Sequence, residues 1–273
     1  MKLGQRALLM GVLNVTPDSF SDGGEFAAVE DAVAHGLAMA AAGADMIDVG
    51  GESTRPGAPP VSAREECRRI VPVIRELREA LDLPISVDTT KAEVAAAALE
   101  QGASIVNDVS GMRADPGMHA VVRDAEAGMI LMHSRGTPET MQTLTDYADP
   151  VEDIARELDE MVAQALERTG LPETHVMVDP GVGFAKTAEQ NLLLIRATAR
   201  FRQSGRPVLM GPSRKSFIGV AMGGARPADR VWGTAAAVTA CVLHGADMVR
   251  VHDVPEMRDV LCIANALRTC TFE

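Results

Sequence analysis

The chain has 273 residues, of which 47% are hydrophobic and 23% are charged, and its formal net charge is -12. Its 26 basic residues form no polybasic run, which excludes a broad surface for nucleic acid or for anionic membranes. Apolar residues are spread over short runs, and none approaches the roughly 20 residues that a transmembrane helix needs. We therefore expect a globular protein with no nucleic-acid partner and no membrane span.

The chain begins with Lys2 and Arg6 ahead of an apolar run over residues 7–13. This order is superficially that of a signal peptide, but Asn14 and Pro17 end the run early and no small-residue cleavage site follows. We interpret the run as a buried first strand. The four cysteines lack the spacing of a metal site, and a chain of this size needs no disulfides, so the expected location is the reducing cytoplasm.

Short apolar runs rich in β-branched residues recur along the chain, at 8–13, 46–49, 85–87, 105–106, 129–132, 176–178, 208–210 and 248–251. Stretches typical of amphipathic helices lie between them, for example at 25–42, 64–81, 151–169 and 188–203. Strands that alternate with helices pair in parallel, because a crossover that holds a helix returns the chain in the same direction. The pattern predicts an α/β fold with a single domain over residues 1–273, a (β/α)8 TIM barrel.

An open doubly wound sheet is the alternative fold. Three segments, AGADMIDV, QGASIVND and HGADMVRV, repeat one arrangement of a glycine after a helix and a short strand that ends in polar groups. The glycine-rich segment GGESTRPG at 50–57 lacks the GxGxxG spacing of a dinucleotide site and does not open a helix directly. These observations favour the barrel.

Polar side chains stand at the end of nearly every apolar run. They are Asn14, Asp48 with Glu52, Asp88, Asn107, His133, Asp179, the segment 213–215, and Arg250 with His252. Taken singly, each is explained by helix capping or turn formation. A parallel barrel, however, gathers all its strand ends on the face where barrel enzymes place their active sites.

Three of these residues, Asp88, Asn107 and Asp179, are expected to be buried and therefore to need hydrogen-bonding partners. A ligand with several N–H donors would supply them. Lys215 is expected to share the pocket, where it balances the carboxylates and donates to a carbonyl or a ring nitrogen. The cluster is typical of a site for a flat, polar heterocycle.

Arg250 and His252 alternate at the end of the last strand, so both side chains point to the same side. The loops after the last two strands are the usual phosphate-binding position of barrels, and here they contain the sequences SRKS and RVHD. We therefore predict an anion site. A cap or a surface histidine is the alternative for His252.

The segments 14–24 and 50–60 are long loops rich in Gly, Pro and Ser. Such loops in a compact barrel are usually lids or binding loops, although a solvated insertion is the alternative. Phe20 and Arg55 are the residues that such a lid would bring to an aromatic carboxylate, by stacking and by charge.

Eight strings, one for each expected strand, resemble the dihydropteroate synthase family. They are GVLNVTPDSFSDGG, MIDVGGESTRPGA, ISVDTTK, IVNDVSG, LMHSRGTPETMQ, DPGVGFAK, GPSRKSFIG and VRVHDV. The resemblance runs almost from end to end. It implies a pterin-binding TIM barrel that joins (7,8-dihydropterin-6-yl)methyl diphosphate to p-aminobenzoate in folate biosynthesis.

The resemblance also implies roles for individual residues. The pterin diphosphate would be bound by Thr54, Asp88, Asn107, Asp179, Phe184, Lys215, Arg250 and His252, and p-aminobenzoate by Phe20, Arg55, Pro56, Lys215 and Ser216. The residues expected to act in catalysis are Asp88, Lys215, Arg250 and His252. Asn14 would bind the cofactor, Mg²⁺. Sulfonamide inhibitors and a second copy of the chain, in a homodimer formed through the outer helices, are the other implied partners.

Two other functions remain open at this point. One is a methyltransferase domain that binds methyltetrahydrofolate in a related barrel, which gives no reason for the SRKS and STRPG segments. The other is a catalytically silent paralogue that binds a pterin or a partner. Loss of a polar residue at a strand end would be typical of such a paralogue, and none is missing here.

Overall fold

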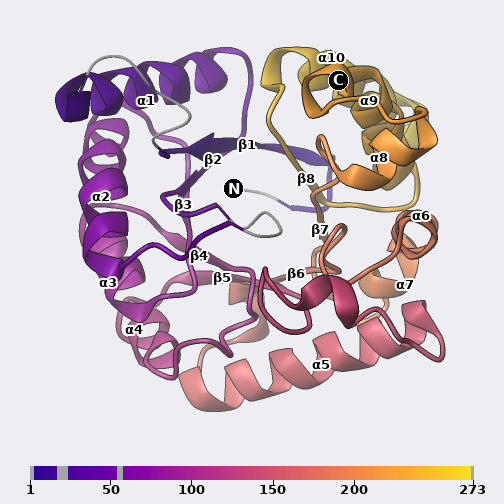
Figure 1. Ribbon diagram of the computed structural model, residues 1–273, viewed down its shortest axis with the longest axis horizontal. Helices are drawn as coiled ribbons and strands as arrows, with labels where there is room; N and C mark the ends of the chain where they lie inside the picture. Colours follow the sequence, from indigo (N-terminus) through magenta and orange to yellow (C-terminus); the bar gives the residue numbers. More distant parts are fainter. Residues whose placement is uncertain (1–2, 17–23, 54–57, 272–273) are drawn as a thin grey trace.

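The computed structural model describes residues 3–16, 24–53 and 58–271, which form a barrel of parallel strands surrounded by helices (Figure 1). The strands are β1 Leu8–Asn14, β2 Met46–Gly50, β3 Ile85–Asp88, β4 Ile105–Asp108, β5 Gly128–Met132, β6 Val176–Asp179, β7 Leu209–Met210 and β8 Met248–Val251. Each lies within a few residues of an apolar run in the sequence. Every paired strand runs parallel to its neighbour.

The strands follow the order β6-β5-β4-β3-β2-β1-β8-β7, which places the first and last strands of the chain side by side. A single bridge between Val178 and Val208 joins the two edges of this sheet. The Val178 amide also donates to the Pro207 carbonyl oxygen at 3.0 Å. The (β/α)8 barrel is therefore confirmed, and the open doubly wound sheet is wrong.

The helices cover the outside of the barrel (Figure 1). They are α1 Gly24–Ala41, α2 Ala63–Ala80, α3 Ala92–Glu100, α4 Met118–Asp124, α5 Pro150–Thr169, α6 Ala188–Arg196, α7 Thr198–Arg202, α8 Ser216–Ala221, α9 Val231–Leu243 and α10 Val254–Thr269. Short 3-10 turns occur at Met141–Thr143, Glu173–His175 and Pro227–Asp229. None of the helices in the described part of the chain has the length and apolar character needed to cross a membrane.

The helix expected over 188–203 is interrupted at Ala197, where φ is -94° and ψ is 13°. The Thr198 hydroxyl donates to the Ile195 carbonyl oxygen at 2.8 Å, in the turn just before it. Side-chain hydrogen bonds of this kind compete with the regular helix ladder. The chain therefore forms α6 and α7 in place of one continuous helix.

An apolar floor fills the interior of the barrel, and it consists of Leu8, Met10, Met46, Ile130, Met177, Leu209 and Met248 with Ile105 beside them. Successive side chains of a strand point to opposite faces. Residues two positions further along the same strands therefore also point inward, above this floor. They include Asp48, Asn107, Asp179 and Arg250, so the alternation places a polar layer at the carboxyl end of the barrel.

Candidate active site at the carboxyl end of the barrel

The polar layer contains the three residues that the sequence predicts for a heterocycle. Asp88 and Asn107 are direct neighbours across β3 and β4, and Asp179 ends β6 opposite Met132 of β5. All three are buried. The prediction that these residues share one interior is therefore confirmed, whereas their roles toward a ligand stay predictions.

Arg250 crosses the barrel from β8 and pairs with two carboxylates. Its Nε lies 2.6 Å from Asp48 Oδ2, and its Nη2 lies 2.6 Å from Asp88 Oδ2. Asp48 is wholly buried and also accepts hydrogen bonds from Ser86 Oγ at 2.6 Å and from Asn107 Nδ2 at 3.0 Å. One network thus links the inward side chains of β2, β3, β4 and β8.

Asp88 retains an unused acceptor in this network. Its Oδ1 is buried and has no hydrogen-bond partner among the described residues. Burial raises the pKa of Asp88 to about 7; the positive charge of Arg250 opposes this effect, and the nearby carboxylate of Asp48 adds to it. A buried acceptor without a partner is costly, so this oxygen is a natural point of contact for an N–H donor of a ligand.

Asp179 lies near the cation of Lys215. Its Oδ1 accepts from the Gly181 amide at 2.7 Å, and burial raises its pKa while that hydrogen bond and the charge of Lys215 lower it. The Lys215 Nζ lies 4.2 Å from the centroid of the Phe184 ring, a cation–π geometry. A Cβ on Gly183 would lie 2.8 Å from Lys215 Cδ, so the glycine makes room for the lysine side chain.

The loop after β7 is held in a strained conformation next to Lys215. Arg214 has a φ of 58°, and its Nε donates to Asp253 Oδ2 at 3.0 Å. The Arg214 amide donates to Thr234 Oγ1 at 3.1 Å. Ser216 is exposed and is the first residue of α8. These hydrogen bonds hold Arg214 in its left-handed conformation, which fixes the direction of the two residues that follow it.

His252 is half-buried, and its surroundings favour a neutral ring. Burial lowers its pKa to about 3, and the charges of Arg250 and Arg214 lower it further. The His252 amide donates to Ser213 Oγ at 3.1 Å, and the same hydroxyl lies 3.0 Å from His252 Nδ1. When the hydroxyl donates to Nδ1, the ring proton is on Nε2, which is then a donor.

Asn14 is the half-buried last residue of β1. Its Cα partner is Gly50, which in turn is the partner of Asp88. Within residues 3–16, 24–53 and 58–271, no hydrogen bond engages the Asn14 side chain, and no group of three His, Cys, Asp or Glu residues could hold a metal alone. Mg²⁺ commonly takes one or two protein oxygens with waters and substrate phosphates. The Asn14 amide oxygen fits such a site.

Four predicted residues, Phe20, Thr54, Arg55 and Pro56, lie outside the described residues. The base of the second loop is described. Glu52 Oε1 accepts from the Val61 amide at 2.8 Å, and Glu52 also forms an ion pair with Lys91. Glu52 thereby joins the two ends of the segment that contains three of these residues.

Two residues of the site region have no assigned role from the sequence. Asp48 is visible there only as a polar strand end, although its inward position in β2 follows from the alternation with Met46. Lys186 ends the string DPGVGFAK, where a lysine in an otherwise apolar and glycine-rich segment is the one available signal. The structure buries both residues.

Comparisons with known proteins agree with this geometry. A model of a family described as pterin binding enzymes matches residues 10–252. A dihydropteroate synthase from Synechocystis is 50% identical over 264 residues, which cover 97% of this chain and 91% of that protein.

Two solved structures have the same fold. A dihydropteroate synthase from Xanthomonas albilineans with 4-aminobenzoic acid is 44% identical with a TM-score of 0.90, and the match covers 96% of this chain and 93% of that one. A dihydropteroate synthase from Yersinia pestis in complex with a sulfonamide drug is 38% identical with a TM-score of 0.92, over 98% and 97% of the two chains. Neither match supports the methyltransferase interpretation.

Proposed function

The chain belongs to the dihydropteroate synthase family, transferases of folate biosynthesis, and we propose that it transfers the pterinylmethyl group of a dihydropterin diphosphate to p-aminobenzoate. The observation that carries this proposal is the polar layer above the apolar floor. It presents Asp88 Oδ1, which is buried and has no partner among the described residues, next to Asn107 and in the same interior as Asp179. These acceptors match a ring system with several N–H donors.

The pterin lies between the acceptors of the polar layer and the Phe184 ring. Asp179 accepts from the amino-pyrimidine edge, and Asp88 and Asn107 contact the remaining polar atoms. Lys215 balances the carboxylates and donates to a carbonyl or ring nitrogen. The cation–π contact of Lys215 with Phe184 supports this arrangement, because it places the ammonium at the edge of the same pocket.

The diphosphate lies at the mouth, near Arg250 and His252; Thr54, which is also predicted to bind it, lies outside the described residues. Arg250 uses Nε and Nη2 for Asp48 and Asp88, and no described residue accepts from its Nη1. His252 adds a neutral Nε2–H donor. Asn14 would hold Mg²⁺, which when bound stabilises negative charge on the leaving oxygen. The N–H donors of Arg250 and His252 stabilise the same negative charge as it develops on the leaving oxygen.

The reaction is a dissociative displacement. The bond between the pterin methylene carbon and the diphosphate oxygen breaks, and the oxygen keeps the electron pair. The electron-rich dihydropterin delocalises the resulting cation until the amine nitrogen of p-aminobenzoate forms the new C–N bond and loses a proton. No covalent enzyme intermediate is needed. Exclusion of water matters because the cation would otherwise be hydrolysed.

The second substrate is placed by this proposal at Lys215 and Ser216, and the other residues predicted to contact it, Phe20, Arg55 and Pro56, lie outside the described residues. The exposed Ser216 at the start of α8 supports a contact with the carboxylate of p-aminobenzoate. The related protein from Yersinia pestis binds a sulfonamide drug. Sulfonamides are therefore proposed to compete with p-aminobenzoate for this place.

A homodimer formed through the outer helices is also proposed. Exposed apolar side chains lie on neighbouring helices, with Leu192 and Leu193 on α6, Val220 on α8 and Trp232 on α9. Trp232 is 74% exposed and Val220 is 67% exposed. Sedimentation velocity should give the mass of two chains, and V220E should shift the protein to the mass of one. A monomeric wild-type protein would contradict this proposal.

The test of the activity is direct. Purified protein with Mg²⁺, the dihydropterin diphosphate and p-aminobenzoate should form dihydropteroate, measured by chromatography. Lys215→Ala and Asp179→Ala should lose most of kcat/KM while the circular dichroism spectrum stays unchanged, and the exposed-site control Asp229→Asn should keep it. No product from folded protein would favour a silent pterin-binding paralogue. Release of diphosphate without p-aminobenzoate would support the dissociative path. Diphosphate release that strictly requires p-aminobenzoate would contradict the dissociative path.

A further inference from the structure

The loop of residues 180–186 joins β6 to α6 and contains Phe184. Its backbone has positive φ at Gly181 (73°), Gly183 (87°) and Ala185 (50°). Glycine adopts this region easily, but an alanine in it is strained. The conformation of the loop therefore has to be held by contacts from outside it.

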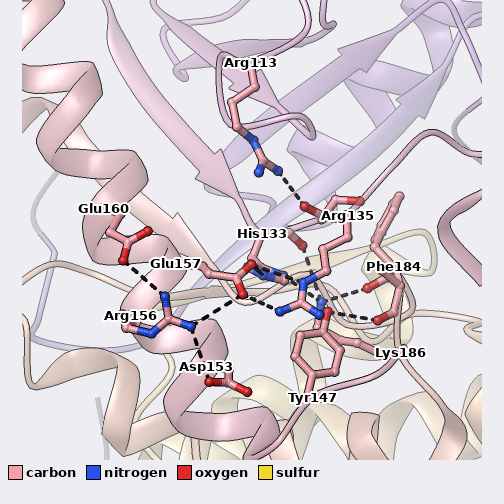
Figure 2. A network of polar contacts seen from close by, with 12 residues as sticks. Arg113, His133, Arg135, Tyr147, Asp153, Arg156, Glu157, Glu160, Phe184 and Lys186 are labelled. Atoms are coloured by element: carbon pink, nitrogen blue, oxygen red, sulfur yellow. Dashed lines mark hydrogen bonds and ion pairs between the residues drawn. The ribbon is translucent and has the colours of Figure 1, made fainter. Parts of the chain in front are cut away.

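Lys186 ends this loop, and its side chain makes the central contact. The residue is only 3% exposed. Its Nζ lies 2.7 Å from the Phe184 carbonyl oxygen, 3.1 Å from His133 Nδ1 and 3.4 Å from the His133 carbonyl oxygen (Figure 2). An ammonium has three donors and no acceptor, so each of its N–H groups has one acceptor here. Lys186 thereby binds the loop to the end of β5.

His133 connects this contact to α5. Its Nδ1 accepts from the ammonium, so the ring proton is on Nε2, which donates to Glu157 Oε2 at 2.9 Å. Burial lowers the pKa of His133 to about 4, and this agrees with a neutral ring. Glu157 is held in turn by an ion pair with Arg135 (Figure 2).

A second and uncharged contact holds the same loop. The Tyr147 hydroxyl donates to the Ala185 carbonyl oxygen at 3.0 Å, and the Arg135 guanidinium carbon lies 3.9 Å from the centroid of the Tyr147 ring. The Tyr147 contact and the Lys186 contact therefore support adjacent carbonyl groups of one loop. They differ in charge, which makes Tyr147 a matched control for Lys186.

The same loop and strand end fix two residues of the pterin site. The His133 amide donates to the Asp179 carbonyl oxygen at 2.8 Å. A Cβ on Gly181 would lie 1.9 Å from the His133 carbonyl oxygen, so the two segments approach closely. The backbone carbonyl oxygen of Phe184 accepts from Lys186, and the Phe184 ring lies beneath the Lys215 ammonium.

We propose that Lys186 is a positioning residue of the pterin site, which holds the Asp179 carboxylate and the Phe184 ring in place through His133 and the loop 180–186. The inference rests on the proposed function, because it assigns the role of Lys186 to the binding of that substrate. Lys186 acts through these neighbours and does not itself contact the pterin.

The charge of Lys186 has a second effect. The charged groups that influence it come from four segments: Asp179 from β6, Arg135 from the segment after β5, Glu157 from α5 and Lys215 from the segment after β7. Burial lowers the pKa of Lys186 to about 7, and Asp179 opposes this effect. The same attraction lowers the pKa of the Asp179 carboxyl. Loss of the ammonium should therefore make Asp179 easier to protonate.

The first experiment compares Lys186→Met with Tyr147→Phe in the complete enzyme. Lys186→Met keeps the length of the side chain and removes its charge and donors, and it should raise the KM for the pterin diphosphate about tenfold. The KM for p-aminobenzoate should change less than about twofold, since Lys186 lies on the pterin side. The acid limb of kcat/KM for the pterin diphosphate should move up by about half a pH unit or more in Lys186→Met and stay in place in Tyr147→Phe. An acid limb at the wild-type position in Lys186→Met would overturn the proposal.

The second experiment keeps Lys186 and changes its acceptor, so it remains decisive if Lys186→Met does not fold. His133→Asn retains an oxygen at the position of Nδ1 but no longer reaches Glu157. His133→Gln reaches Glu157 with an N–H but offers no acceptor to Lys186. The KM for the pterin diphosphate should stay close to wild type in His133→Asn and rise severalfold in His133→Gln. Equal effects of the two variants would refute the role of the Lys186 contact.

The wild-type enzyme separates this inference from the proposed function. If wild-type protein forms dihydropteroate and the Lys186 and His133 variants behave like wild type, only the inference fails. If folded wild-type protein forms none, the proposed function fails, and the pterin affinity of the same variants, measured by calorimetry, still decides whether Lys186 positions the site.

Discussion

Replacing Asp48 with Asn removes one buried charge and hardly changes the volume of the side chain. Asp48 Oδ2 accepts from Arg250 and Asn107, and Oδ1 accepts from Ser86. The amide oxygen of the new side chain can keep the first two hydrogen bonds. Its nitrogen can donate to the Ser86 hydroxyl, which turns to accept. The substitution therefore tests the charge of Asp48 more than its hydrogen bonds.

The expected loss in the free energy of unfolding depends on the ion pair that Arg250 retains. Removing one partner of a buried ion pair typically destabilises a protein by about 3 to 5 kcal/mol. Arg250 retains Asp88 at 2.6 Å, so we expect the lower end of this range, about 3 kcal/mol. For a chain of this size, that corresponds to a fall in Tm of about 6 to 12 °C. Asp48→Ala, which also loses the hydrogen bonds, should cost about 5 kcal/mol.

Urea unfolding followed by circular dichroism measures the free energy of unfolding. Asp229→Asn is the matched control, since it breaks the Arg226–Asp229 pair, whose side chains are 81% and 50% exposed. Exposed pairs contribute at most about 1 kcal/mol. If Asp48→Asn lay within about 1 kcal/mol of wild type, the pair with Arg250 would not stabilise the barrel as argued.

The remaining predictions concern pH, the metal and the backbone. Because the pKa of Asp88 is raised to about 7 in the folded protein, the folded state binds more protons than the unfolded state between about pH 4 and 7. This contribution to stability is complete at the acid end and lost as the pH rises through 7, so unfolding at pH 5 and pH 8 should show the loss in wild type and not in Asp88→Asn. A chelator should abolish dihydropteroate formation and added Mg²⁺ restore it, and Asn14→Ala should need severalfold more Mg²⁺ for half-maximal rate. Gly181→Ala should cost more than about 3 kcal/mol, because it adds a clash 1.9 Å from the His133 carbonyl oxygen to the strain of its φ. Gly170→Ala, with a similar φ of 70° and open space around it, should cost only about 1 kcal/mol.

The strands and the polar layer could be predicted because they depend on local pattern. A run of apolar residues identifies each strand, and the alternation of side chains then decides which strand-end residues point inward. Asp88, Asn107 and Asp179 follow from this reasoning directly. The interruption at Ala197 does not, since it depends on the rotamer in which Thr198 donates to the turn before it.

The partners of the buried charges could not be predicted from the sequence. Arg250 pairs with Asp48, which lies 202 residues earlier in the chain, so the contact exists only once the barrel has closed. Lys186 presents a harder case. Two of its three acceptors are backbone carbonyl oxygens, which every residue type provides, and their position depends on the fold of two loops.

The charges around the polar layer leave the carboxylates prepared for a ligand. Arg250 holds Asp88 through Oδ2 and leaves Oδ1 buried without a partner among the described residues. The Gly181 amide likewise holds Asp179 through Oδ1, and Lys215 adds a positive charge nearby. Each carboxylate is therefore oriented by a donor before any substrate arrives. Because this orientation is achieved during folding, a pterin that donates to the remaining oxygens needs little rearrangement of the site, and its binding energy can be used to align the methylene carbon with the incoming amine.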